Sequence, residues 1–206
     1  MGSAYRLFYQ EPVHIVRGEG VWLFDYLGNQ YLDMYNNVPH VGHCHPKVVK
    51  ALIEQIKILN THTRYLHENV IDFAQRITDK FPSALDTAMF SCTGSEANEL
   101  ALRIARTFTG GTGIIVTDFA YHGNTQAIYE ISTEDISEKE IPNYVVTVPT
   151  PDIYRGEFCG EDAVDQYAEK VLDALEILKC RKIKPAAFII DTIISSAGVV
   201  ATPPGY

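Results

Sequence analysis

The chain has few of the features that mark an exported, membrane-bound or nucleic-acid-binding protein. Its four cysteines form neither a CxxC pair nor a zinc-ligand spacing. Net charge is −9, from 17 Lys and Arg against 26 Asp and Glu, and no basic run indicates a nucleic-acid or acidic-membrane surface. No apolar stretch is long enough to span a bilayer, and the N-terminus lacks the apolar core of a signal peptide. We therefore expect a cytoplasmic protein that binds neither nucleic acid nor membrane.

The N-terminal part of the chain instead shows two regular hydrophobic patterns. Residues 13–35 alternate apolar and polar side chains around the turn sequences RGEG and LGNQ, which predicts a small antiparallel sheet. A helix is predicted to start at Pro46, because the missing N–H of proline costs nothing in the first turn. Its apolar residues fall on one face: Val48, Val49, Leu52, Ile53, Ile56 and Leu59.

Helices and strands alternate in the rest of the chain. Helices are predicted at 68–80, 95–107 and 161–180, and strands at 87–91, 113–118, 143–149 and 186–192. This alternation predicts an α/β fold with a mostly parallel, helix-covered sheet, beside the small antiparallel N-terminal lobe. The stripe expected to be buried in the longest helix consists of Val164, Tyr167, Val171, Leu175 and Leu178. We expect residues 1–60 to form the lobe with its leading helix, and 61–206 the first part of a larger domain.

The sequence TGSE at 93–96 stands where an apolar run turns into an amphipathic helical pattern. Thr93 followed by Glu96 fits a capping box at a helix start. Gly94 lets the backbone approach a ligand closely, and the free N–H groups and dipole of a helix start favour an anion, to which Ser95 could add a hydroxyl. The same four residues also fit an ordinary capped helix, so the motif alone leaves both interpretations open.

Two further candidates lie after predicted strands. The sequence DFAYHGNT places Tyr121, His122 and Gly123 after the strand at 113–118, and Asp191 closes the strand at 186–192. Ligands bind at the carboxyl edge of open α/β sheets, so these residues could face a common ligand, with the ring of Tyr121 stacked on a flat cofactor. A packed tyrosine, a surface histidine and a turn-capping aspartate are equally compatible with the same residues.

Two polar segments carry weaker indications. His40, His43 and His45 have a spacing that suggests metal ligands, but Gly42 and Pro46 favour a shaped loop that leads into a helix, and we predict no metal site. Arg64, in LNTHTRYLHEN, is either a solvated charge or an anion anchor.

Together these segments resemble the class III aminotransferases, enzymes that use pyridoxal 5′-phosphate (PLP) and have the fold-type-I architecture. The matching segments are YLGNQYLDMYNNVPHVGHCHPKVVKAL, CTGSEANELALRIAR, DFAYHGNT and AAFIIDTIISSAGVVATPPGY. The resemblance covers nearly the whole chain but only the N-terminal half of a family member. It implies that Gly94 and Ser95 hold the PLP phosphate, with Thr93 assisting.

The resemblance also implies the surroundings of the pyridine ring. Tyr121 would stack on the ring, and His122 and Gly123 would line the same wall. The family usually has a glutamate where this chain has Asp191, so the contact of this shorter side chain with the cofactor is in question.

Other parts of the family pattern fall outside the chain. The Asp-Glu motif, whose aspartate pairs with the pyridine nitrogen, and the lysine that forms a Schiff base with PLP are both expected beyond residue 206. None of the nine lysines present stands in the matching context, so the catalytic residue is unknown and this chain alone is expected to be inactive. The alternative to the N-terminal part of an enzyme is an incompetent fragment or a PLP- or phosphate-binding module.

Three segments are similar to one branch of the family, the phospho-lyases that act on ethanolamine phosphate or phosphohydroxylysine. They are NNVPHVGHCHPKVV, LNTHTRYLHENVIDFAQR and PDIYRG. This implies a small amine or amino-alcohol phosphate as substrate, and either transamination or elimination of phosphate as reaction. Elimination needs cations for the leaving phosphate, for which Arg64 and Arg155 are candidates. The family also implies a homodimer.

Overall fold

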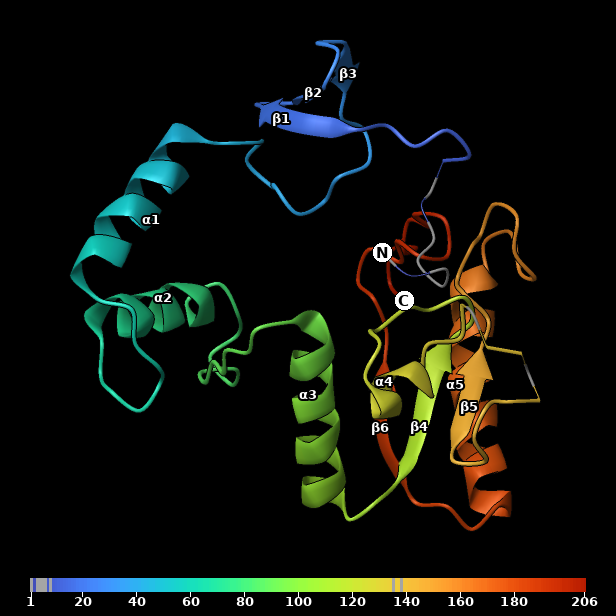
Figure 1. Cartoon of the computed structure of the whole chain (residues 1–206). Helices are drawn as coiled ribbons and strands as arrows, with labels where there is room; N and C mark the ends of the chain where they lie inside the picture. Colours follow the sequence, from blue (N-terminus) through green and yellow to red (C-terminus); the bar gives the residue numbers. More distant parts are fainter. Residues whose placement is uncertain (1, 3–6, 8, 135, 138) are drawn as a thin grey trace. The chain divides into compact units, whose positions relative to one another are not determined.

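A computed structural model describes residues 2, 7, 9–134, 136, 137 and 139–206 (Figure 1). The chain forms two compact units, Met1–Arg76 and Ile77–Tyr206. The domain division predicted after residue 60 lies earlier in the chain than this boundary and stays a prediction.

The first unit contains the predicted antiparallel sheet. Its three strands pair in the order β1-β2-β3 and comprise β1 (Ile15–Glu19), β2 (Trp22–Asp25) and β3 (Gln30–Leu32). Positive φ angles of 59° at Gly20 and 87° at Gly28 allow the two tight connections. The carboxylate of Asp25 fixes the second turn, because it accepts hydrogen bonds from the amide of Asn29 (2.8 Å) and the hydroxyl of Tyr31 (2.9 Å).

Helix α1 (Pro46–Ile58) follows, with Pro46 in its first turn as predicted. No residue of α1 is buried, and its apolar side chains are exposed, Leu52 at 65% and Ile56 at 69%. Helix α2 (Glu68–Thr78) begins in the first unit and ends in the second. Within the described residues, no helix is both long and apolar enough to cross a membrane.

The second unit contains the predicted parallel sheet. Its elements are α3 (Gly94–Thr109), β4 (Gly113–Thr117), α4 (Gln126–Tyr129), β5 (Val145–Val148), α5 (Ala163–Cys180) and β6 (Pro185–Ile189). The strands lie in the order β5-β4-β6, and both pairings are parallel. Every residue of β4 is buried, as expected of a central strand covered on both faces.

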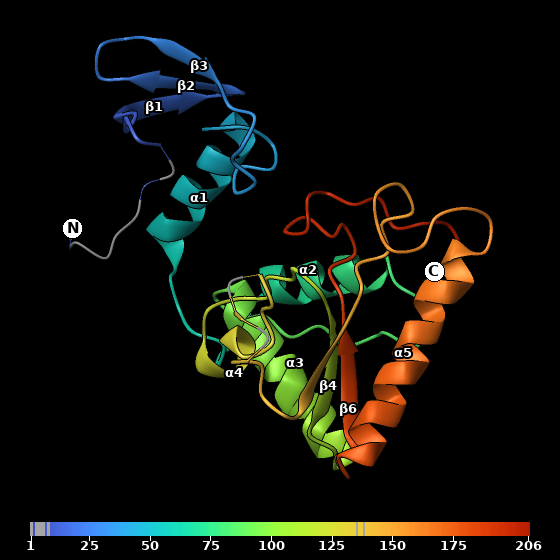
Figure 2. The ribbon, with the colours of Figure 1, turned by 90° about the vertical axis from the view of Figure 1, so that its right-hand side faces the viewer.

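The faces of the sheet are covered by different helices (Figures 1 and 2). Ile114 and Val116 of β4 pack with Leu102 of α3 on one face, where α4 also packs. Ile115, which points the other way, packs with Leu178 of α5. Because side chains of a strand alternate between its faces, the run GIIVT supplies both cores of this unit. The predicted helix-covered α/β sheet is therefore confirmed.

Two details of the prediction are wrong. In α5, Tyr167 and Leu178 are buried as expected, but Leu175 is 37% exposed and its neighbour Ala174 is buried in its place. The small side chain of Ala174 lets the helix approach the sheet closely. Residues 87–91 form no strand, because a strand needs a hydrogen-bonded neighbour and no described strand pairs with this segment.

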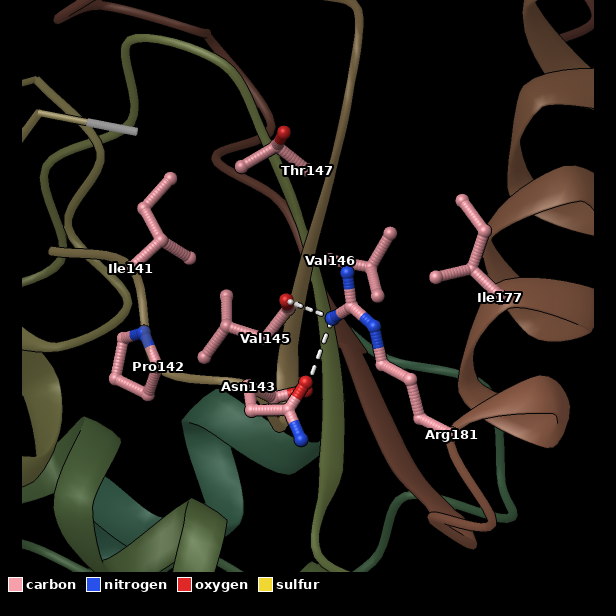
Figure 3. A pocket seen from close by; sticks show the side chains of 8 residues that line it. All are labelled: Ile141, Pro142, Asn143, Val145, Val146, Thr147, Ile177 and Arg181. Carbon is pink, nitrogen blue, oxygen red and sulfur yellow. Dashed lines mark hydrogen bonds between the residues drawn. The ribbon is translucent and has the colours of Figure 1, made fainter. Parts of the chain in front are cut away.

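The two edges of the parallel sheet differ. Along the outer edge of β5, Nη1 of Arg181 donates to the carbonyl oxygens of Asn143 (2.9 Å) and Val145 (3.1 Å). Figure 3 shows this guanidinium beside the strand, in a hollow of about 420 Å³ that Ile177 and Pro142 also line. Along β6, no described residue covers the outer backbone groups in this way.

Candidate cofactor-binding site

An open cavity of about 520 Å³ lies at the carboxyl ends of β4 and β6. Three segments meet there: the start of α3, the loop after β4 and the loop after β6. The lining residues are Gly94, Ser95, Asn98, Tyr121, His122, Gly123, Ile189, Ile190, Asp191 and Thr192. The structure thus brings together all but one of the residues predicted to hold the cofactor, and the exception is Thr93.

The start of α3 is the predicted capping box. Thr93 is the N-cap, and its Oγ1 accepts a hydrogen bond from the amide of Glu96 (3.1 Å). The carboxylate of Glu96 returns to the amide of Cys92 (3.1 Å) and accepts from the hydroxyl of Thr93 (3.2 Å). The hydroxyl of Thr93 is therefore engaged at the cap, and Thr93 does not line the cavity.

The next two amides of α3 are left for a ligand. Among the described residues, no acceptor is found for the N–H groups of Gly94 and Ser95. Gly94 is exposed, and a Cβ built on it would meet no atom within 4 Å. The helix start is therefore open, and its free amides and dipole favour an anion such as a phosphate.

Ser95 connects α3 to the loop after β4. Its hydroxyl donates to Oδ1 of Asn124 (3.1 Å) and accepts from the amide of Asn124 (3.1 Å). The loop lies so close to the helix that a Cβ on Gly123 would be 2.9 Å from Cα of Ser95, and Gly123 has a φ of 137°. Only glycine fits this position without a shift of the backbone.

The same loop presents an aromatic ring and an imidazole. Tyr121 is 53% exposed, whereas His122 is only 9% exposed, and its carbonyl accepts a hydrogen bond from Nδ2 of Asn98 (2.7 Å). Nε2 of His122 is buried without a partner among the described residues. Burial lowers the pKa of His122, and the negative charge of Asp191 offsets this only in part, so the ring is neutral at pH 7.

Asp191 lies beyond the end of β6, which stops at Ile189, and caps a turn. Its Oδ1 accepts from the amide of Ile193 (2.9 Å), and its Oδ2 accepts from the amide and the hydroxyl of Ser195 (both 2.8 Å). Burial tends to raise the pKa of Asp191, but the hydrogen bonds from Ile193 and Ser195 outweigh it and lower the pKa below the ordinary value. The carboxylate is therefore ionised at neutral pH.

The two predicted phosphate anchors are not among the cavity residues. The side chain of Arg155 is 72% exposed, and its Nε lies 3.6 Å from Oδ2 of Asp152. Arg64 belongs to the first unit, where its amide donates to Nδ1 of His62 (3.1 Å). A second hollow, of about 360 Å³, lies beside it in the same unit and is lined by Thr61, Thr63 and Tyr65 among others.

The sequence reasoning missed several residues that shape the cavity. Asn98 lies one turn after Gly94 on the same face of α3, so helical spacing could have indicated it. Ser132 accepts the amide hydrogen of His122 (3.0 Å), and Ser196 that of Tyr121 (3.1 Å). No short sequence motif marks either serine: Ser132 lies ten residues beyond His122, and Ser196 reaches the loop from 75 residues away.

The described residues contain no group of three or more His, Cys, Asp or Glu side chains placed to hold a metal ion. In the first unit, Nε2 of His43 instead lies within hydrogen-bond distance of Oδ2 of Asp33, at 2.7 Å. No lysine among the described residues lines the cavity.

These features fit a phosphorylated aromatic cofactor. The free amides of Gly94 and Ser95 suit the phosphate, Tyr121 offers a ring face, and His122 has a buried nitrogen that lacks a partner. A parallel α/β sheet with such a site at its carboxyl edge defines a cofactor-binding domain. The class III aminotransferase model matches residues 7–206, and the chain belongs to this family. The cofactor of the family is PLP.

Named relatives place the chain more closely. It is 39% identical to an alanine–glyoxylate aminotransferase 2-like protein of Drosophila melanogaster, over 100% of the chain and 44% of the relative. It is 35% identical to ethanolamine-phosphate phospho-lyase homolog 1 of Caenorhabditis elegans, over 100% of the chain and 47% of the relative. The chain thus spans about half the length of these curated relatives.

A solved structure agrees with these relatives. A phospholyase from Arthrobacter in complex with phosphoethanolamine superposes with a TM-score of 0.90 and 40% identity, over 100% of this chain and 49% of that one. The fold is that of PLP fold-type-I enzymes, as predicted.

Proposed function

We propose that the chain is the N-terminal part of a PLP-dependent enzyme that eliminates phosphate from a small amino-alcohol phosphate. The observation that carries this proposal is the close likeness, over the whole chain, to the phospholyase that binds phosphoethanolamine. The relative named as an ethanolamine-phosphate phospho-lyase supports the same substrate class.

In this proposal the cavity residues hold the cofactor. The amides of Gly94 and Ser95 bind the phosphate at the start of α3, where the helix dipole adds to their attraction. The half-exposed ring of Tyr121 stacks on the pyridine ring, and His122 and Gly123 line the same wall. Thr93 assists indirectly, because its hydroxyl caps the first turn of the helix.

When bound, PLP supplies an aldehyde that joins the substrate amine and a ring that accepts electrons from the reacting bond. The chain contributes the charged and hydrogen-bonding groups of the cavity wall. Asp191 keeps one negative charge on the cavity wall, and the neutral ring of His122 keeps one nitrogen free for a hydrogen bond. Loss of phosphate also needs cations, for which we propose Arg64 and Arg155.

Product analysis of the full-length protein tests this function. With PLP and ethanolamine phosphate, we expect release of inorganic phosphate without a requirement for a keto-acid acceptor. Replacing Arg64 with Ala should lower kcat/KM for this substrate, and an unchanged value would exclude the arginine as a phosphate anchor.

Transamination is the second candidate, supported by the relative named as an alanine–glyoxylate aminotransferase 2-like protein. It predicts acceptor-dependent formation of a keto product and no phosphate release in the same assay. A third possibility is that the chain alone only binds PLP or phosphate. Treatment of the isolated chain with PLP and borohydride should then trap no adduct at a cavity residue, because no lysine of the described residues lines the cavity.

We also propose a cytoplasmic homodimer. All four cysteines are free and exposed, which suits a reducing compartment. The exposed apolar face of α1 provides surface that a second copy could bury. Sedimentation of the full-length protein would test the dimer.

A further inference from the structure

The backbone around Tyr121 is held by a hydroxyl group from another segment of the chain. The amide of Tyr121 donates to Oγ of Ser196 (3.1 Å), and this hydroxyl donates in turn to the carbonyl of Phe119 (2.8 Å). Ser196 belongs to the loop after β6, whereas Tyr121 belongs to the loop after β4. One serine therefore bridges the two loops at the residue whose ring faces the cavity.

The position of Ser196 depends on the turn that Asp191 closes. The carboxylate of Asp191 binds the amides of Ile193 and Ser195, so it fixes the backbone up to the residue before Ser196. Ile194, inside this turn, is buried and has a φ of 52°. A β-branched residue rarely adopts this conformation, so the turn depends on contacts such as those of Asp191.

We propose that Asp191 and Ser196 form a relay that positions Tyr121, and that Asp191 acts through this relay rather than by touching the cofactor. Each carboxylate oxygen of Asp191 is already bound within the turn, and the relay ends at the Tyr121 amide. The inference rests on the proposed function in one respect, which is that the ring of Tyr121 contacts PLP.

The relay depends on the short side chain of Asp191. A carboxylate one carbon from Cα can reach amides two and four residues ahead and close a compact turn. A glutamate would carry its oxygens one methylene farther from the backbone, so it could not close the same turn. We therefore expect Asp191→Glu to speed hydrogen exchange of the Tyr121 amide as much as Asp191→Ala does.

Amide hydrogen exchange in the ligand-free chain tests the relay directly. Ser196→Ala and Asp191→Ala should each speed exchange of the Tyr121 amide about tenfold, the effect of losing one hydrogen bond. The neighbouring Ala120 amide is an internal control, because it is bound by Thr133 (2.9 Å) and should change less than about twofold. Ser196→Thr keeps the hydroxyl and should restore protection.

Unchanged Tyr121 exchange in Ser196→Ala would overturn the relay, whether or not the chain binds PLP. Equal acceleration at Ala120 and Tyr121 would also overturn it, because this would indicate general loosening. The Ser196→Ala variant keeps the experiment decisive if Asp191→Ala does not fold.

A double-mutant cycle on PLP affinity, measured by calorimetry, tests whether the relay acts on the cofactor. Ser196→Ala should weaken binding several-fold in the wild-type background and have no further effect in a Tyr121→Ala background. Independent losses in the two backgrounds would refute action through Tyr121. Failure of the unmodified chain to bind PLP would count against the proposed cofactor site, and the exchange experiment would still decide the relay.

Discussion

Gly123 and Gly94 line the same cavity but should respond in opposite ways to the same change. A Cβ on Gly123 would lie 2.9 Å from both Cα and Cβ of Ser95, closer than real Cβ contacts. A Cβ on Gly94 would meet nothing within 4 Å. Gly123→Ala and Gly94→Ala are therefore a matched pair of variants with equal added volume.

The expected cost at Gly123 has two parts. Crowding against the backbone of Ser95 costs about 1–3 kcal/mol, as other overpacked sites do. The φ of 137° adds roughly 1–3 kcal/mol of backbone strain for any residue with a side chain. Gly123→Ala should thus lower the free energy of unfolding by roughly 2–6 kcal/mol, whereas Gly94→Ala should leave it unchanged or raise it by up to about 1 kcal/mol.

Urea denaturation followed by far-UV circular dichroism measures the difference. Exchange of the β4 amides assigns the change to the second unit, because β4 is its central strand. With an m-value of about 2 kcal/mol/M, Gly123→Ala should lower the urea midpoint by about 1–3 M. Equal midpoints for the two variants would refute the close approach of Gly123 to Ser95.

Three further predictions concern other parts of the chain. Arg181→Ala should expose the edge of β5 and increase self-association by light scattering, while Lys179→Ala, on the same helix end, should not. The hydrogen bond from the backbone amide of Asn36, together with one that involves His43, lowers the pKa of Asp33 to about 2. The stability that the ionised carboxylate contributes is therefore present above about pH 4 and lost towards pH 2. Asp33→Asn should accordingly destabilise the chain at pH 7 and progressively less on acidification, and a variant that matches wild type at pH 7 would contradict this. Thr93→Ala should lower the free energy of unfolding by about 1 kcal/mol, because the α3 cap is lost. An unchanged urea midpoint would show that the cap contributes nothing to stability.

Much of the fold could be predicted from the sequence because the relevant forces are local. The run GIIVT is typical of a buried strand, and TGSE fixes the start of α3 through contacts within four residues. Residues 87–91 have an equally apolar pattern but form no strand, because strand formation depends on a partner that the local sequence does not specify. The burial of Ala174 rather than Leu175 has a similar cause. The packing of α5 against the sheet decides which side of the helix is buried, and the local sequence does not specify this packing.

The residues of the candidate site also divide into those that a local motif indicates and those that only the tertiary structure brings to the cavity. Gly94, Ser95 and Tyr121 could be proposed because each stands in a short motif beside a predicted strand or helix end. Ser196 could not, because its role depends on the approach of the loop after β6 to the loop after β4. For Asp191 the sequence left a ligand contact and a turn cap open, and in the structure its oxygens cap the turn through the amides of Ile193 and Ser195.

The two edges of the parallel sheet in the second unit differ in how readily a further strand could pair with them. On the β5 side, Arg181 already binds the outward carbonyls of Asn143 and Val145, so a new strand would have to displace it to pair with the start of β5. A strand that extends this sheet, from the same polypeptide or from another molecule, therefore meets less competition beside β6, the strand that leads to Asp191 and the cavity.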